Sequence, residues 1–264
     1  MSQRQYHIDA APGDVADHIL LVGDPDRAQS VANQFDSIRY SNSHREYRLH
    51  TGRHEGLDVT VVCVGMGAGS MEIGVVELCQ IVEQPTFIRC GSCGALQPGL
   101  DLGDLVIAQG AYRLESASLG FVGEGYPAFA HAEAVIALCQ AAEESGATHH
   151  VGVTATASGF YGAQGRTAPG FPPRDPESVE RLAAQGVLNL EMEASCLFTL
   201  AAMRGARAGA VCAVYANRPQ DTFIEQPAMG EAEERCFKVG LGALHHLAAM
   251  RKARGTRPHW HPGV

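Results

Sequence analysis

The stretch Thr86-Phe87-Ile88-Arg89-Cys90-Gly91-Ser92-Cys93-Gly94-Ala95 decides the fold, because an apolar strand-like run ends at an arginine and a glycine-rich turn. An unpaired guanidinium at the end of a buried strand would cost several kcal/mol. The position of Arg89 therefore predicts that an anion meets it. The hydroxyl of Ser92 and the backbone N–H groups of the turn would be donors to the same anion.

Similar apolar runs recur along the chain, each short and closed by turn-forming residues. We predict strands over residues 18–22, 59–64, 86–89, 105–108, 150–154 and 208–215. Helical patterns lie between them, over residues 71–82, 131–145, 192–203 and 230–251. This alternation predicts an α/β fold with a mixed, largely buried central sheet flanked by helices.

The domain organisation is simple, because neither an internal repeat nor a linker interrupts the 264 residues. The proline-rich segment 169–176 is too short to separate domains and reads as a surface loop. We therefore predict a single domain over residues 1–264, of which 251–264 form a flexible tail.

Composition excludes several classes of protein. Hydrophobic residues make up 45% and charged residues 19% of the chain, which is typical of a globular protein with a sizeable core. The net charge of −9, with no Lys/Arg-rich run before residues 251–254, argues against a nucleic-acid partner. We find neither an apolar N-terminal signal nor an apolar run of about 18 residues, so we expect a cytoplasmic chain without a membrane partner.

The eight cysteines lie mostly inside apolar runs, where cysteine acts as a small buried hydrophobe. Cys90 and Cys93 have the C-x-x-C spacing of redox and zinc sites, but a second pair or ligand-spaced histidines are missing. The twelve histidines form no H-E-x-x-H set, so we interpret them as surface or packing residues. We predict reduced thiols and no metal.

Two further glycine-containing segments follow predicted strands, at the sheet edge where α/β proteins bind ligands. In Gly23-Asp24-Pro25-Asp26-Arg27, the glycine lets backbone N–H groups approach an anion and Arg27 supplies a forked donor. The segment Gly65-Met66-Gly67-Ala68-Gly69-Ser70 suggests a dinucleotide site, but its G-x-G-x-G spacing differs from that fingerprint. An acidic residue to hold a ribose is also missing after the next strand, which disfavours NAD.

Two carboxylates, Glu191 and Glu193, open the apolar helical pattern that begins at Met192. Acidic residues often occupy the first turn of a helix because they complement its dipole. A role in a ligand site is the alternative, and the local sequence leaves both open.

Together these segments resemble the nucleoside phosphorylase superfamily in its hexameric bacterial form. Four motifs carry the resemblance in the same order: Gly23 to Arg27, Ser43-His44-Arg45-Glu46, Arg89 to Ala95, and Glu191-Met192-Glu193. The resemblance covers residues 5–250 and is greatest to the uridine phosphorylases. It implies that family's distorted, barrel-like sheet and cleavage of a nucleoside by inorganic phosphate as co-substrate, with no cofactor.

The resemblance also implies roles for individual residues. Phosphate would be bound by Gly23, Arg27, Arg45, Arg89 and Ser92, and ribose by His7, Met192 and Glu193. Three arginines around one dianion would supply both charge and bidentate geometry. Glu193 and the phosphate would stabilise an oxocarbenium-like sugar. Arg45 and His7 would come from a neighbouring subunit, in a homo-hexamer built as a trimer of dimers.

The base would be bound by Cys93, Gly94, Phe160, Gln164, Arg166 and Glu191. Gln164 offers a donor and an acceptor, and Arg166 offers donors to a carbonyl, as the uracil edge requires. Arg218 would act in catalysis with Arg89 and Glu193, because arginine stabilises the charge on a leaving uracil. Purine-cleaving relatives carry an aspartate in this neighbourhood, where the chain has Ala216.

Some positions depart from the uridine phosphorylase pattern. Ser92-Cys93 resembles the purine-specific branch, and Tyr215 is bulkier than the expected aliphatic residue and could reshape the base pocket. Glu46, Met66 and Ser70 match a monovalent-cation site of some relatives, on too little signal to predict an ion.

We therefore predict a pentosyltransferase that converts uridine and phosphate into uracil and ribose 1-phosphate, with deoxyuridine and thymidine as further substrates to test. The alternative is a purine or broad-specificity nucleoside phosphorylase. A hydrolytic nucleosidase would leave Arg27, Arg45 and Arg89 without a dianion. A non-catalytic nucleoside-binding protein would not need all of these positions to be filled.

Overall fold

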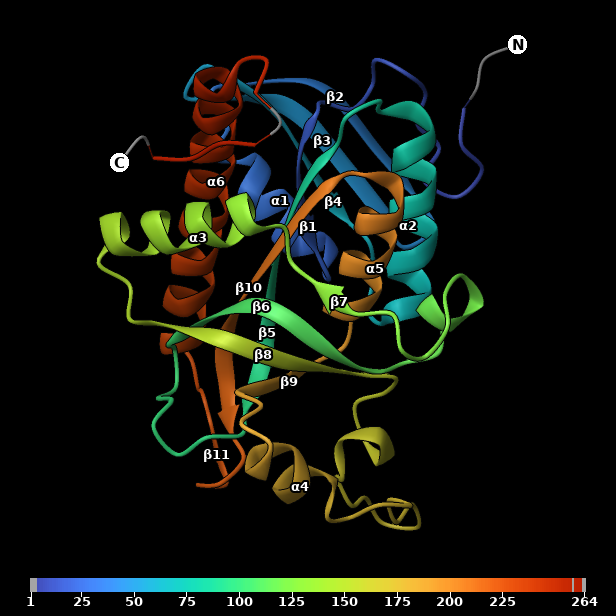
Figure 1. The fold of residues 1–264 in the computed structure, drawn as a ribbon, viewed down its shortest axis with the longest axis vertical. Helices are drawn as coiled ribbons and strands as arrows, with labels where there is room; N and C mark the ends of the chain where they lie inside the picture. Colours follow the sequence, from blue (N-terminus) through green and yellow to red (C-terminus); the bar gives the residue numbers. More distant parts are fainter. Residues whose placement is uncertain (1–3, 258, 263–264) are drawn as a thin grey trace.

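Five strands close into a distorted barrel in the computed structural model, which describes residues 4–257 and 259–262. They are β5 (Thr86–Ala95), β6 (Leu105–Leu114), β8 (His149–Ala157), β9 (Asn189–Glu191) and β10 (Arg207–Asn217). The ring closes because β5 pairs with β10 on one side and with β9 on the other (Figure 1). This confirms the predicted mixed, barrel-like sheet.

The sheet continues outward from β5 through a further set of strands. These are β1 (His18–Val22), β4 (Leu57–Cys63), β3 (Tyr47–His54) and β2 (Ser37–His44). β1 runs parallel to β4 and β5, whereas β3 pairs antiparallel with its neighbours on both sides. Two short strands, β7 (Ala128–Phe129) and β11 (Thr222–Phe223), pair with β6 and β10.

Helices cover two faces of the sheet and enclose two apolar cores. Figure 1 shows α1 (Pro25–Ala32), α3 (Ala132–Ser145) and α6 (Ala228–Arg254) on one side, and α2 (Ala68–Ile81) and α5 (Ala194–Arg204) on the other. Alternate residues of β1 enter different cores: Leu20 packs on the α3–α6 side and Leu21 on the α2–α5 side. The sixth helix, α4 (Ser178–Ala184), lies near the short helical turn Gly162–Gln164 at one end of the molecule.

The predicted strand 18–22 is confirmed at its bounds, and the other predicted strands and helices occur with shifted ends. One expectation is wrong: residues 91–95 continue β5 and do not form a turn. Glycines are tolerated there because β9 and β10 pair with the strand on both sides. A second is wrong too, since Glu191 ends strand β9 and the helix begins only at Ala194.

The C-terminal segment begins with the last turn of a long helix. α6 extends to Arg254, three residues beyond the predicted helix, and three basic residues complement the dipole of its last turn. The backbone N–H of Trp260 donates to the buried carboxylate of Glu133. Residues 258, 263 and 264 lie outside the described part of the chain, and within that part no helix is both long and apolar enough to cross a bilayer.

α6 approaches the barrel so closely that one of its residues must be glycine. A Cβ on Gly240 would lie 2.2 Å from the sulfur of Cys90 in β5 and 2.9 Å from Leu20 Cδ1. We expect Gly240→Ala to lower the free energy of unfolding by about 1–3 kcal/mol, through overpacking. Gly230→Ala in the same helix is the control, because its nearest atom would be 3.6 Å away. Equal urea midpoints for the two variants would contradict this.

Candidate functional site

A cavity of about 800 Å³ gathers most of the residues that the sequence singles out. Its lining includes Gly23, Arg27, Arg45, Arg89, Ser92, Cys93, Gly94, Phe160, Gln164, Arg166, Glu191, Met192 and Glu193. Glu46, Met66 and Ser70 line it as well. The motifs from β1, β5, β9 and the start of α5 therefore meet in one place, although they are far apart in the sequence.

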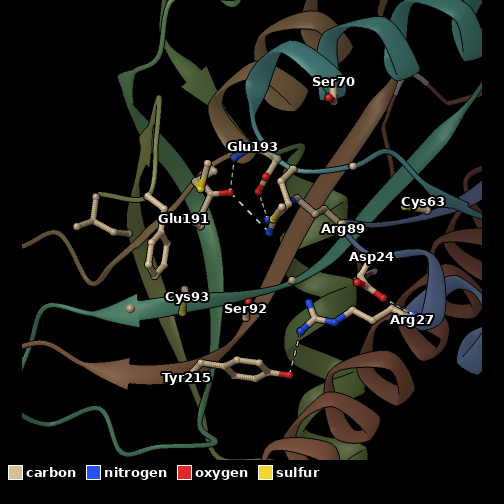
Figure 2. Close-up of a pocket in the computed structure, with 18 of the residues that line it drawn as sticks. Asp24, Arg27, Cys63, Ser70, Arg89, Ser92, Cys93, Glu191, Glu193 and Tyr215 are labelled. Atoms are coloured by element: carbon tan, nitrogen blue, oxygen red, sulfur yellow. Dashed lines mark hydrogen bonds and ion pairs between the residues drawn. The ribbon is translucent and has the colours of Figure 1, made fainter. Parts of the chain in front are cut away.

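Arg89 is the centre of this arrangement, and its side chain is almost fully buried. Figure 2 shows its guanidinium directed at Glu193, to which Nη2 donates, while Nη1 lies 3.6 Å from Glu191 Oε2. Burial alone would lower the pKa of Arg89, but the charges of Glu193 and Glu191 raise it well above its ordinary value. The arginine thus stays charged, and its predicted need for a counter-charge is met by carboxylates of the chain itself.

Gly91 makes room for this guanidinium. A Cβ at residue 91 would lie 2.2 Å from Nη1 of Arg89 and 2.7 Å from its Cζ. Because Gly91 sits two residues along β5 on the same face, any larger residue would displace the arginine. The glycine of the motif therefore serves side-chain packing and not a turn.

Arg89 also donates to a thiol on the adjacent strand. Its Nη1 lies 2.9 Å from the sulfur of Cys212 in β10. The pKa of Cys212 is lowered by a hydrogen bond from Cys93 and by the charge of Arg89. All eight cysteines lie outside disulfide bonds, and seven of them are buried. Cys93 thus belongs to the wall that holds Arg89.

Glu191 and Glu193 are both buried, and each has a set of donors. Glu191 accepts from the hydroxyl of Thr156 and from the backbone N–H groups of Glu193 and Ala194, at 2.9 and 2.8 Å. Glu193 accepts from the backbone N–H of Gly67, which begins α2. Burial raises the pKa of Glu191. The glycine-containing segment Gly65 to Ser70 therefore contributes to the site, because its backbone orients Glu193.

Arg27 is held by two side chains that the sequence did not predict as partners. Its Nε lies 2.7 Å from Glu233 Oε1 in α6, and its Nη2 donates to the hydroxyl of Tyr215 at 3.1 Å. Figure 2 shows the Tyr215 ring directed at Arg27. Tyr215 thus lies against Arg27, and burial raises the pKa of Tyr215 to about 12. Glu233 has no local signal, because it is one of several acidic residues in a long helix.

Arg45 contacts the N-terminal segment, and His7 within that segment contacts α2. Arg45 Nη2 donates to the hydroxyl of Tyr6 at 3.2 Å, and its guanidinium lies 5.2 Å from the ring centroid. His7 Nδ1 lies 2.6 Å from Glu77 Oε1. His7 is outside the residues that line its own chain's cavity, whereas Arg45 is among them.

The opposite end of the cavity combines aromatic rings with two arginines. Arg166 lies 4.3 Å from the ring centroid of Phe160 and 5.5 Å from that of Phe223. Arg218 Nη1 donates to the backbone oxygen of Gln164 at 3.1 Å, although Arg218 is not a lining residue itself. Burial lowers the pKa of both arginines. This end can stack a flat ring and offer donors to carbonyl oxygens.

Comparisons with known proteins agree with this geometry. The family model described as "Phosphorylase superfamily" matches residues 17–245. The uridine phosphorylase of Thermococcus kodakarensis is 44% identical over 98% of the chain and 93% of the relative. That of Escherichia coli is 37% identical over 92% and 97%. The guanosine phosphorylase of Halorubrum lacusprofundi is 34% identical over 92% and 99%.

The hydroxyl of Thr156 offers a test of how the carboxylates are held. It donates to Glu191 and accepts from the backbone N–H of Ser195 at 2.9 Å. Thr156→Val would remove the hydrogen bond to Glu191 Oε1 and the acceptor of the Ser195 N–H. We expect the free energy of unfolding, measured with urea, to fall by about 1–3 kcal/mol.

Thr199→Val is the matched control, because the buried Thr199 hydroxyl has no hydrogen-bond partner among the described residues. We expect this variant to change the free energy of unfolding by less than about 0.5 kcal/mol, or to raise it. If Thr156→Val were as stable as the control, the hydroxyl would not hold Glu191.

Proposed function

Because the chain belongs to the phosphorylase superfamily, we propose that it cleaves the N-glycosidic bond of uridine with inorganic phosphate. The products are uracil and ribose 1-phosphate, which makes the enzyme a pentosyltransferase. One observation carries the proposal: Arg27, Arg89 and Glu193 line a single cavity whose other end holds Phe160 and Gln164. Groups suited to bind an anion, a sugar and a flat base are thus gathered in one cavity.

Phosphate is assigned to the arginine end of the cavity. Arg89 and Arg27 each use part of their donor set on Glu193, Glu233 and Tyr215. A guanidinium has five N–H donors, so both retain donors for a bound oxyanion. Ser92 and Gly23 also line the cavity. Ser92 adds a hydroxyl donor, and Gly23 adds a backbone N–H that an anion can approach closely. Inorganic phosphate is the co-substrate, and the reaction needs no cofactor.

The sugar lies between the phosphate and the base, next to Met192 and Glu193. As the C–N bond breaks, positive charge develops on the anomeric carbon, and a phosphate oxygen forms the new C–O bond. The Glu193 carboxylate stabilises this charge because it is already oriented by Gly67 and Arg89. The electron pair of the broken bond leaves with uracil, which then takes up a proton.

Uracil is assigned to the end that holds Phe160, Gln164 and Arg166. Phe160 stacks on the ring, while Gln164 and Arg166 read its polar edge. Arg218 positions Gln164 through the backbone oxygen and adds positive charge near the leaving group. Ala216 lines the cavity where a purine-specific enzyme needs an acid.

A purine nucleoside is the second candidate substrate. The guanosine phosphorylase relative and the Ser92-Cys93 pair favour it. Against it stands Ala216, which lines the cavity in the neighbourhood where purine-cleaving relatives carry an aspartate. We therefore rank uridine first.

We further propose a homo-hexamer, built as a trimer of dimers, in which Arg45 and His7 complete the site of a neighbour. Both side chains are at least partly accessible in the single chain, and Tyr6 and Met66 are 70% and 79% exposed. A neighbouring subunit can contact side chains that are exposed in this way. The enzyme works in the cytoplasm on small molecules.

The nucleoside preference is tested with uridine, thymidine, inosine and guanosine, each with and without phosphate. We expect uridine cleavage to depend on phosphate, and the purine nucleosides to have a kcat/KM at least about tenfold lower. Faster cleavage of guanosine or inosine than of uridine would assign the enzyme to the purine branch. Cleavage that persists without phosphate would identify a hydrolase.

The phosphate assignment is tested with Arg27→Lys, measured by steady-state kinetics. Lysine keeps the charge but cannot contact Glu233, Tyr215 and an oxyanion at the same time. We expect the KM for phosphate to rise at least about tenfold and the KM for uridine to stay within about threefold. Arg48→Lys is the control, because Arg48 also lines the cavity but its contacts are the backbone oxygen of Pro25 at 3.3 Å and the exposed carboxylate of Asp26 at 3.9 Å. Equal effects of the two variants would contradict the assignment.

A further inference from the structure

A cluster of three potential metal ligands lies outside the nucleoside cavity. It consists of His54 at the end of β3, Glu55 in the following turn, and His245 in α6. Each offers one ligand atom, and the three atoms lie within 4.8 Å of one another. His54 Nδ1 and His245 Nε2 are 2.9 Å apart. We propose that these residues bind a divalent metal ion of the zinc type.

The spacing of the ligand atoms suits such an ion. With metal–ligand bonds of about 2.1 Å, tetrahedral ligand atoms lie about 3.4 Å apart. The two imidazole nitrogens need to separate by only about 0.5 Å to reach this spacing, which is the difference between that value and the 2.9 Å contact. Small side-chain rotations therefore convert the present contact into a ligand pair.

The chemistry of the cluster selects the class of metal. Two imidazoles and one carboxylate match the nitrogen and oxygen ligands of zinc and of related transition metals. Magnesium and calcium prefer oxygen ligands alone, so the histidines disfavour them. Without a metal, the two nitrogens must share one proton in a hydrogen bond. With a metal, both can direct a lone pair at the same ion.

The turn that carries Glu55 is well defined. His54 pairs with Leu57 across the hairpin, which leaves Glu55 and Gly56 as the two turn residues. Both have positive φ angles, +49° and +80°, as a tight hairpin of two residues requires. Glu55 is exposed and Gly56 has no side chain, so a water molecule can take the fourth coordination position.

The cluster lies at the other end of the strands from the nucleoside cavity. β4 starts at Leu57, directly after the turn, and runs parallel to β1, with Val59 opposite His18 and Cys63 opposite Val22. The cavity lining begins at these far ends, with Cys63 and with Gly23 directly after Val22. A bound metal would thus connect the β3–β4 turn to α6 without entering the nucleoside site. Its effect is on stability.

The test uses the full chain without an affinity tag, because added histidines would bind zinc themselves. Zinc binding is measured by isothermal titration calorimetry, and the coordination by the visible absorption of bound Co²⁺. We expect one more zinc ion per wild-type chain than for the double variant His54→Gln/His245→Ala. We also expect zinc to raise the melting temperature of the wild type more than that of the double variant.

Single variants separate the cluster from other zinc-binding groups. We expect His245→Ala to weaken zinc binding at least about tenfold. His246→Ala is the matched control: His246 is the next residue in α6, but its Nε2 lies 2.8 Å from Glu144, outside the cluster. All eight cysteines remain in every variant, so binding to thiols appears equally in each. Phosphorolysis by each variant verifies that it is folded. Equal zinc affinity of the wild type and His245→Ala would overturn the proposal.

Discussion

The buried ion pair between Arg89 and Glu193 is the interaction on which the site depends. Removing two charges from water is costly unless hydrogen bonds satisfy the remaining polar atoms. Neighbouring groups supply these hydrogen bonds: the Thr156 hydroxyl donates to Glu191, and the backbone N–H of Gly67 donates to Glu193. Gly91 leaves the space that the guanidinium fills. The charges, and not an apolar core alone, explain why β5, β9 and α5 must meet at this point.

The alternation of apolar runs in the sequence predicted the fold class, and the family resemblance pointed to candidate site residues, most of which line one cavity; His7 and Arg218 do not line it. β1 was predicted at its correct bounds from four apolar residues that follow His18 and are closed by Gly23. Strand β2 was missed because its residues are mostly exposed and polar. The contact between Arg27 and Glu233 was also beyond prediction, since more than two hundred residues separate them and only the packing of α6 brings them together.

Tyr215 shows how a small backbone irregularity changes what a residue does. From the sequence, its bulk was expected to reshape the base pocket. β10 changes register against β5 between Val214 and Ala216, which leaves Tyr215 without a partner in the ladder. Its hydroxyl lies near Arg27 and Glu233, at the arginine end of the cavity. The direction of the Tyr215 side chain could not be predicted from the sequence, because such a prediction assumes that side chains alternate regularly between the two faces of a strand.

The two ends of the cavity are built from different kinds of structure. Arg89 and the carboxylates belong to closed strands and the start of a helix, whereas Phe160, Gln164 and Arg166 belong to the irregular segment between β8 and α4 (Figure 1). Substitutions in that segment disturb few hydrogen bonds of the barrel. Under the proposed function, evolution can therefore change which nucleobase an enzyme of this fold accepts by substitutions in that segment. The strands and the helix start that hold Arg89 and the carboxylates next to the sugar can stay unchanged.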